Sequence, residues 1–387
     1  MRIGFDAKRA FFNTTGLGNY SRTLIADLAK YYPDNAYVLY SPQQHMPIGG
    51  PNFKLQGNMT LRYPKGLVQN LLKGSLWRSL SLGKHMAADK LEVYHGLSHE
   101  LPLNIQKSQA KSVVTVHDLL FMRYPDLYPR FDRFMYHLKW KNACQKADRV
   151  IAISEQTKQD IIEFLGITAN KITVVHQSCA PIFYDYGDKM FLQHGFFVEQ
   201  SYDIPYNVPD DYILYVGSIT ERKNLLHVVK AIEALQTKLD VHLVVVGSGD
   251  VYAETVQQYI ANKGLTNNFT FLADVPTKNL PALYRCAKAL VHPSIFEGFG
   301  LPIIEGLFSR IPVIASTGSC FAEAGGTHTL YVDPYDVAAM ADAIEKVLTD
   351  GALRMDMILY GWEHAQQFHG QTVASKLMTV YQSLLTN

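Results

Sequence analysis

The sequence of 387 residues predicts an α/β protein with two Rossmann-like domains, each built on a parallel sheet, that face a cleft. Three observations lead to this fold class. Short apolar runs rich in Val and Ile alternate with helical stretches along most of the chain, as in parallel sheets with right-handed crossover helices. The alternation stops once, near the middle, and then begins again. The length is too great for one small core, and 48% hydrophobic residues can fill two.

The predicted strands are apolar runs bounded by Gly, Pro or Ser, which is typical of buried parallel strands. In the first half of the chain they cover residues 3–6, 37–40, 93–95, 113–117, 150–153 and 172–175. In the second half they cover residues 212–216, 242–246, 269–272, 289–292, 313–315 and 330–332.

The alternation is interrupted over residues 180–211, a stretch crowded with aromatic residues, Gly and Pro. We therefore expect four segments: an N-terminal domain over 1–185, a linker or insertion over 186–210, a C-terminal domain over 211–370 and a helix within 371–387 that packs back on the first domain. Ligands of open α/β sheets bind at the carboxyl ends of the strands. Function is thus expected in the loops that face the cleft.

Composition excludes several classes of protein. The formal charge of +1 gives no global field that would hold a nucleic acid. The four cysteines form no C-x-x-C pair, which argues against a disulfide framework or a zinc ribbon. The N-terminus lacks the apolar core of a signal peptide, and no run of 18 apolar residues occurs. The expected compartment is the cytoplasm.

The strongest chemical signal is the stretch HPSIFEGFGLPIIEG at residues 292–306, which follows a strand and enters a helix. Gly298 and Gly300 allow the backbone to approach a ligand, and the N–H groups of Gly300 and Leu301 are free donors at the helix start. Glu297 and Glu305 lie about two helical turns apart, so both can face one polar ligand. The alternative is a Gly-rich loop with solvated glutamates.

This Glu-x7-Glu pattern resembles the signature of the retaining family-4 glycosyltransferases, which have the two-domain GT-B fold. The resemblance covers essentially the full chain and includes TGLGNYSRTL, TVHDLLF, AISEQTKQDI and YVGSITERKNL. It implies that Glu297 lies beside the donor sugar and that Glu305 binds the ribose. It also implies that the backbone amides between them hold sugar hydroxyls, at Gly298, Phe299, Gly300 and Leu301.

Two cations, Arg222 and Lys223, stand at the entrance to the helix that follows the strand 212–216. Their charge and the helix dipole suit a diphosphate, although a solvated basic pair is the plain alternative. Many members of the family carry Arg directly after the glycine, where this chain has Ser218. Arg222 is the residue that could replace it, whereas Lys223 matches the family directly.

Two glycine loops are further candidates for the donor site. Gly16 and Gly18 open a helix, and the resemblance places them against the donor diphosphate from the opposite domain. Their GxGxxS form does not fit a dinucleotide site, because ten residues separate the first strand from Gly16 and no acidic residue ends the second strand. Gly247 and Gly249 indicate either a tight strand-to-helix turn or a nearby nucleotide.

His117 ends the strand 113–117, where a side chain can enter the cleft and donate to a sugar hydroxyl or phosphate. A structural histidine beside Asp118 is the alternative, and the resemblance favours a catalytic role for His117 together with Glu297. Glu323, in SCFAEAGG, resembles a family turn or caps a helix.

The resemblance implies transfer of a hexose from a nucleotide diphosphate sugar to an acceptor hydroxyl, with retention of anomeric configuration, in surface polysaccharide or glycolipid synthesis. TVHDLLFMRYPDLY and SITERKNL are most similar to bacterial polysaccharide mannosyltransferases. The first donor expected is therefore GDP-mannose, with UDP-glucose or a UDP-hexosamine next. The acceptor is a carbohydrate or a lipid-linked sugar.

We expect no cofactor and no metal, because the sequence offers no Asp-x-Asp motif near a predicted strand end. The sequence is compatible with three alternatives: a covalent role for Glu297 as nucleophile, a chain that only binds the sugar nucleotide, and an enzyme that hydrolyses or epimerises it.

A basic stretch over residues 62–90 has six Lys or Arg residues against one Asp, with Leu, Val and Trp at helical spacing. Two interpretations fit. It is either an amphipathic helix that touches a membrane surface or a crossover helix whose apolar face packs on the sheet. The first implies a peripheral location at the inner face of the membrane.

Overall fold

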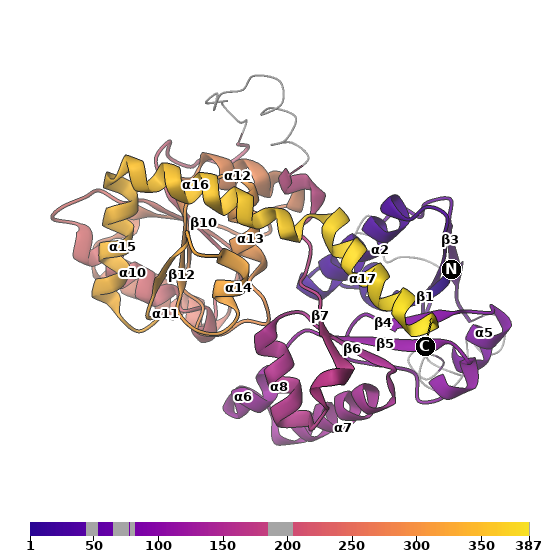
Figure 1. Ribbon diagram of the computed structural model, residues 1–387. Helices are drawn as coiled ribbons and strands as arrows, with labels where there is room; N and C mark the ends of the chain where they lie inside the picture. Colours follow the sequence, from indigo (N-terminus) through magenta and orange to yellow (C-terminus); the bar gives the residue numbers. More distant parts are fainter. Residues whose placement is uncertain (44–52, 65–76, 78–81, 185–203, 387) are drawn as a thin grey trace. The chain divides into compact units, whose positions relative to one another are not determined.

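The computed structural model describes residues 1–43, 53–64, 77, 82–184 and 204–386, which form two compact units. Residues 1–178 and 369–387 make the first unit, and residues 179–368 make the second (Figure 1). Residues 185–203, which include most of the expected linker 186–210, lie outside the described residues.

The first unit contains a seven-stranded parallel sheet in the order β3-β2-β1-β4-β5-β6-β7. Its strands are β1 (Arg2–Asp6), β2 (Ala36–Tyr40), β3 (Met59–Arg62), β4 (Val93–Gly96), β5 (Lys111–Val116), β6 (Arg149–Ala152) and β7 (Ile172–Val174). Its helices are α1 (Lys8–Phe12), α2 (Gly16–Tyr31), α5 (Leu82–Ala88), α6 (Leu120–Arg123), α7 (Arg130–Lys146), α8 (Glu155–Leu165) and α17 (Gly370–Leu385). Short 3₁₀ turns are η1 (Ile105–Ser108), η2 (Pro125–Leu127) and η3 (Ala169–Lys171).

Helices cover both faces of this sheet, which explains why its strands are apolar on both sides. Helices α1, α2 and α17 share one core with the sheet, and α5, α7 and α8 share the other. The last helix joins the first core through Val373, Leu377 and Tyr381, which are at most 1% exposed.

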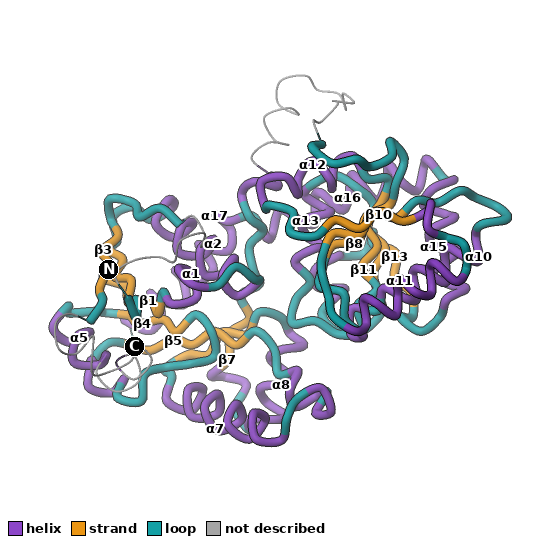
Figure 2. The backbone as a smooth tube through the Cα atoms, turned by 180° about the vertical axis from the view of Figure 1, so that it is seen from behind, coloured by secondary structure: helices purple, strands orange, loops and turns teal. Residues whose placement is uncertain are grey.

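The second unit contains a six-stranded parallel sheet in the order β10-β9-β8-β11-β12-β13 (Figure 2). Its strands are β8 (Ile213–Val216), β9 (Leu243–Val246), β10 (Phe269–Leu272), β11 (Ala289–His292), β12 (Val313–Ser316) and β13 (Leu330–Val332). Its helices are α10 (Leu225–Leu235), α11 (Val251–Asn262), α12 (Leu280–Cys286), α13 (Leu301–Phe308), α14 (Phe321–Gly325), α15 (Val337–Thr349) and α16 (Gly351–Ala365). Its 3₁₀ turns are η4 (Glu221–Lys223), η5 (Thr266–Asn268), η6 (Thr277–Asn279) and η7 (Gln366–Phe368).

The predicted α/β class with two parallel sheets is confirmed, and each predicted strand lies within two residues of an observed one. Strand β3 was not predicted. It is an edge strand in which Thr60 and Arg62 are exposed, so it lacks the continuous apolar run by which the buried strands are recognised.

The basic stretch 62–90 lies mostly outside the described residues, which lack 65–76 and 78–81. Two of its described members have structural partners. Trp77 is 1% exposed and belongs to the core with α5. Arg62 forms an ion pair of 2.8 Å with Asp89. The helical face proposed for a membrane is thus not defined by the described residues.

Candidate functional site

The candidate site of the second unit is built on the loop 293–300, between the carboxyl end of β11 and the start of α13. Gly300 has φ of 112°, in the left-handed region that favours glycine, and it immediately precedes the helix. The turn beyond β12 holds this loop: Ser319 Oγ donates to Glu297 O at 2.9 Å, and Cys320 Sγ donates to Phe299 O at 2.8 Å. Contacts within the second unit therefore position the backbone of the motif.

The loop is also tied to η4, which carries the two predicted cations. The N–H of Ile295 donates to Arg222 O at 2.8 Å, and the Arg222 guanidinium donates to Phe296 O. Arg222 therefore both positions the loop and contributes charge to it.

Glu297 lies between these cations. Its Oε1 atom contacts Lys223 Nζ and lies 3.0 Å from Arg222 Nη1. The three side chains are only 12–21% exposed, so water screens the ion pairs weakly. His292 Nε2 lies 4.0 Å from the same carboxylate oxygen. Arg222 and Lys223 follow strand β8 and Glu297 follows strand β11, and the structure brings the three side chains together.

The electrostatics of the cluster fix its protonation. Burial opposes ionisation of Glu297, but Lys223 and Arg222 outweigh it and lower the pKa of this carboxyl to about 2. Burial, with Lys223 nearby, lowers the pKa of His292 to about 3. Glu297 is thus a carboxylate and His292 a neutral imidazole at neutral pH, which leaves the cluster with one net positive charge. Such a site suits an anionic ligand.

Glu305 has a different environment, although it belongs to the same motif. It lies on α13, where the Tyr284 hydroxyl of α12 donates to its Oε2 atom at 2.7 Å. Burial raises the pKa of Glu305 to about 7, against the opposing effect of the Tyr284 hydrogen bond. The second glutamate is therefore poised to change protonation near neutral pH, whereas the first is not.

Three further polar atoms belong to this region and were not predicted from the sequence. His292 Nε2, Ser294 Oγ and Ser316 Oγ are buried with no hydrogen-bond partner in the described part of the chain. Buried polar atoms usually find partners, because an unpaired one costs about 1–3 kcal/mol. Their place at the ends of β11 and β12 was the available signal. They indicate a surface prepared for a polar ligand.

The predicted glycine loop of the first unit opens α2. Gly16 is exposed, with nothing within 4 Å of the point where a Cβ atom would stand. Gly18 is different, because a Cβ there would lie 1.9 Å from Asn13 O. Its N–H already donates to Asn13 Oδ1 at 3.0 Å. The open part of this helix start is therefore Gly16.

His117 is 3% exposed, and both of its ring nitrogens have partners inside the first unit. Nε2 lies 2.8 Å from Leu97 O, so this nitrogen donates, and Gln177 Nε2 donates to Nδ1 at 3.0 Å. Burial lowers the pKa of His117 to about 4. The imidazole is thus neutral, and contact with a substrate would require one of these bonds to break.

The glycines of the second GxG sequence have a packing explanation. A Cβ on Gly247 would lie 1.9 Å from Gly217 O, and one on Gly249 would lie 2.1 Å from Ile219 O. Both glycines therefore permit close contact between the turns after β8 and β9. Glu323 lies in the first turn of α14.

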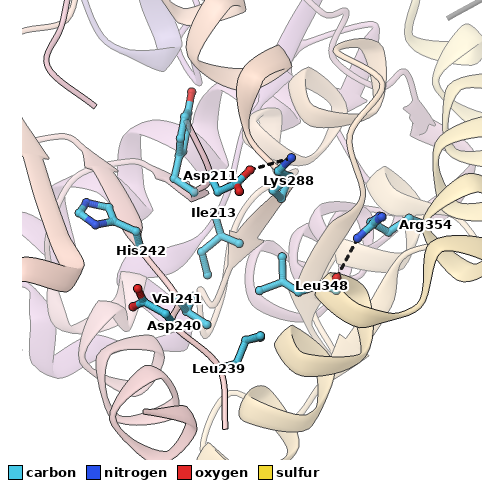
Figure 3. A pocket seen from close by; sticks show the side chains of 10 residues that line it. Asp211, Ile213, Leu239, Asp240, Val241, His242, Lys288, Leu348 and Arg354 are labelled. Carbon is cyan, nitrogen blue, oxygen red and sulfur yellow. Dashed lines mark hydrogen bonds and ion pairs between the residues drawn. The ribbon is translucent and has the colours of Figure 1, made fainter. Parts of the chain in front are cut away.

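A cavity of about 290 Å³ lies elsewhere in the second unit (Figure 3). Its lining includes Ile213 and His242, near the amino ends of β8 and β9, and the 2.8 Å ion pair between Asp211 and Lys288. It thus lies at the edge of the sheet opposite Glu297 and contains none of the predicted site residues. Within the described ranges, no cluster of three metal-ligating side chains occurs, and no helix is long and apolar enough to cross a membrane.

In a comparison with known proteins, both halves of the chain match glycosyltransferase families. Residues 16–178 match the family described as Glycosyltransferase Family 4, and residues 199–364 match Glycosyl transferases group 1. The O-antigen chain mannosyltransferase B of Escherichia coli is 27% identical over 295 residues, which is 76% of this chain and 74% of that protein. The O-antigen chain mannosyltransferase RfbU of Salmonella typhimurium is 29% identical over 280 residues, 71% of each chain.

Solved structures show the same fold. Sucrose-phosphate synthase from Thermosynechococcus elongatus superposes with a TM-score of 0.75 at 20% identity, covering 100% of this chain and 99% of that chain. Anabaena HepE, solved in complex with UDP and glucose, superposes with a TM-score of 0.70 at 17% identity. The match covers 99% of this chain and 100% of that chain.

Proposed function

Because the chain belongs to the GT-B glycosyltransferases, with a family 4 region followed by a group 1 region, we propose that it transfers mannose from GDP-mannose to an acceptor hydroxyl. The proposed transfer retains the anomeric configuration and serves surface polysaccharide or glycolipid synthesis. The names of the two O-antigen mannosyltransferases support the choice of sugar. A UDP-sugar is the second candidate donor, because the HepE structure holds UDP and glucose.

The observation that carries the proposal is the cluster of Lys223, Arg222 and Glu297 beside the start of α13. When a glycosidic bond to a diphosphate breaks, negative charge grows on the leaving group. Fixed cations aimed at that charge stabilise the transition state more than the ground state. Lys223 and Arg222 are the proposed diphosphate ligands, and Gly16 and Gly18 are proposed as further donor-binding residues.

The remaining roles follow from the positions of the motif. Glu297 is proposed to lie beside the sugar as a carboxylate, where it stabilises positive charge at the anomeric carbon. Its oxygen is engaged by two cations, which makes it a weak nucleophile. We therefore favour attack on the same face as departure, with the leaving phosphate accepting the proton of the acceptor hydroxyl. Glu305 is proposed to bind the ribose, and the amides of Gly298, Phe299, Gly300 and Leu301 to bind sugar hydroxyls.

We further propose that no divalent metal is needed, because Lys223 and Arg222 can balance the diphosphate charge. A cytoplasmic location is proposed with it, supported by four cysteines that are all free thiols. Full activity in EDTA is the expected result. A strict requirement for Mg²⁺ or Mn²⁺ would contradict the proposal that no divalent metal is needed.

The decisive experiment measures consumption of GDP-mannose and of UDP-sugars, with the anomeric configuration of the product read by NMR. Lys223→Ala should lower kcat/KM by about 100-fold or more. Lys238→Ala is the matched control, because it also removes a lysine paired with a glutamate, at 3.2 Å from Glu345. Donor binding without turnover on any acceptor would leave only a binding protein, and release of free sugar without acceptor would indicate a hydrolase.

A further inference from the structure

Helix α7 of the first unit has an apolar side that faces solvent. Phe131 is 73% exposed, Phe134 59% and Leu138 47%. Their spacing of three and four residues places them on one helix face. Leu127, in the turn η2 before the helix, is 52% exposed as well. Figures 1 and 2 show α7 beside α8 at the margin of this unit.

This face is not needed to hold the helix in the fold. Ala143 and Cys144 are at most 2% exposed and pack in the core that α7 shares with α5 and α8, with Trp140 against it. A surface helix normally turns one apolar stripe inward and polar residues outward. Helix α7 has an apolar stripe on both sides, and an exposed stripe of large side chains indicates a surface that is covered in use.

The charges around the stripe indicate what covers it. The helix carries five cations against one acidic residue, Asp132: Arg130, Arg133, Lys139, Lys141 and Lys146. At 100° per residue, Arg130 and Lys141 lie on one flank of the stripe and Lys139 on the other. Projecting Phe and Leu side chains bordered by cations are the pattern of a helix that lies in a membrane interface.

We propose that this face of α7, defined by Phe131, Phe134 and Leu138 with their flanking cations, binds an anionic lipid surface. The apolar side chains insert at the boundary of the acyl chains, and the cations contact the headgroup phosphates. The proposal concerns a surface, so it holds or fails independently of the donor and the reaction.

The second unit offers an internal control. Met355 and Leu359 on α16 are also one helical turn apart and are 50% and 48% exposed. Their neighbours include Arg354 but also Asp356 and Glu363, so the surrounding charge is not basic. An exposed apolar pair without a net basic surround should not bind anionic lipid.

The test is sedimentation of the full chain with vesicles of phosphatidylcholine alone or mixed with phosphatidylglycerol. The wild type should bind the mixed vesicles at low salt and be released at high salt. Phe131→Ser/Phe134→Ser should lower the partition coefficient about tenfold or more. Each cation removed in Arg130→Gln/Lys139→Gln should lower it about fivefold. Met355→Ser/Leu359→Ser should change it less than twofold.

Unchanged melting temperatures would show that the variants fold. Phe131→Trp gives a second readout, a blue shift of its fluorescence on mixed vesicles only. Wild type that ignores the mixed vesicles, or equal binding by Phe131→Ser/Phe134→Ser, would overturn the proposal. Loss of a dimer in that variant, seen by light scattering without lipid binding, would assign the face to a second copy of the chain instead.

Discussion

Polar residues at the carboxyl edges of the two sheets differ in their hydrogen-bond partners and in their charge. At the edge of the first sheet, both ring nitrogens of His117 and of His95 are satisfied by protein groups, and both imidazoles are neutral. At the edge of the second sheet, Glu297 is ionised between two cations. There His292 Nε2, Ser294 Oγ and Ser316 Oγ are buried with no hydrogen-bond partner among the residues that the structure describes. Around His117 and His95 the first edge is thus closed, and His99 Nδ1 is its one buried atom beside them without a hydrogen-bond partner among the described residues. At the second edge several such atoms gather near the ionised Glu297.

The largest effect on activity is expected at the second edge. Glu297→Gln keeps the shape of the side chain but removes its charge, so Lys223 and Arg222 lose their only mutual counter-ion in the cluster. We expect kcat to fall about 100-fold while KM for the donor changes less than tenfold, because the lost interaction is made with the transition state. Steady-state kinetics measure both, and a folded variant with full activity would remove this edge as the reaction centre.

The next effect is on stability and belongs to the first edge. His117→Ala should lower the free energy of unfolding by about 2 kcal/mol, because Leu97 O and the Gln177 amide lose a buried partner. His328→Ala, at an exposed histidine, should change it by less than about 0.5 kcal/mol. Urea denaturation measures both. If His117→Ala instead leaves stability intact and abolishes turnover, the first edge is a reaction centre as well.

The third test compares the two glutamates of the motif through pH. Folding raises the pKa of Glu305 from 4.5 to about 7, so its neutral form is favoured in the folded state. Its contribution to stability is present below pH 4.5 and is lost as the pH rises through about 7. Glu305→Gln should flatten this part of the stability profile. The contribution of Glu297, whose pKa is lowered, should remain across that range and be lost only toward pH 2.

The smallest effect is expected at Gly16. Gly16→Ala meets no atom within 4 Å and should change stability by less than about 0.5 kcal/mol. Gly18→Ala should cost several times more, because of its 1.9 Å approach to Asn13 O. A rise in donor KM for Gly16→Ala at unchanged stability would support contact between this loop and the diphosphate. An unchanged KM would remove the loop from the proposed site.

The sheets could be predicted from the sequence because their strands are buried on both faces and therefore read as continuous apolar runs. The gathering of Lys223 and Glu297 could also be anticipated, since each follows a parallel strand of the same sheet.

Partners distant in the sequence could not be predicted in this way. Nothing near His117 indicates that Leu97 and Gln177, 20 and 60 residues away, would occupy its ring nitrogens. Likewise, no local pattern around Ser319 indicates that its hydroxyl donates to the backbone oxygen of Glu297, 22 residues before it. These contacts depend on how loops from separate elements meet, and short-range patterns do not contain that information.

The return of α17 to the first unit has a consequence for synthesis on the ribosome. The first unit begins the chain, yet its core includes Leu377 and Tyr381, and Tyr381 Oη lies 2.6 Å from His95 Nδ1. The second unit, residues 179–368, is contiguous and can close as soon as it has emerged. The part made first is therefore finished last, and until α17 leaves the exit tunnel, the face of the first sheet that it covers stays open to chaperones and proteases.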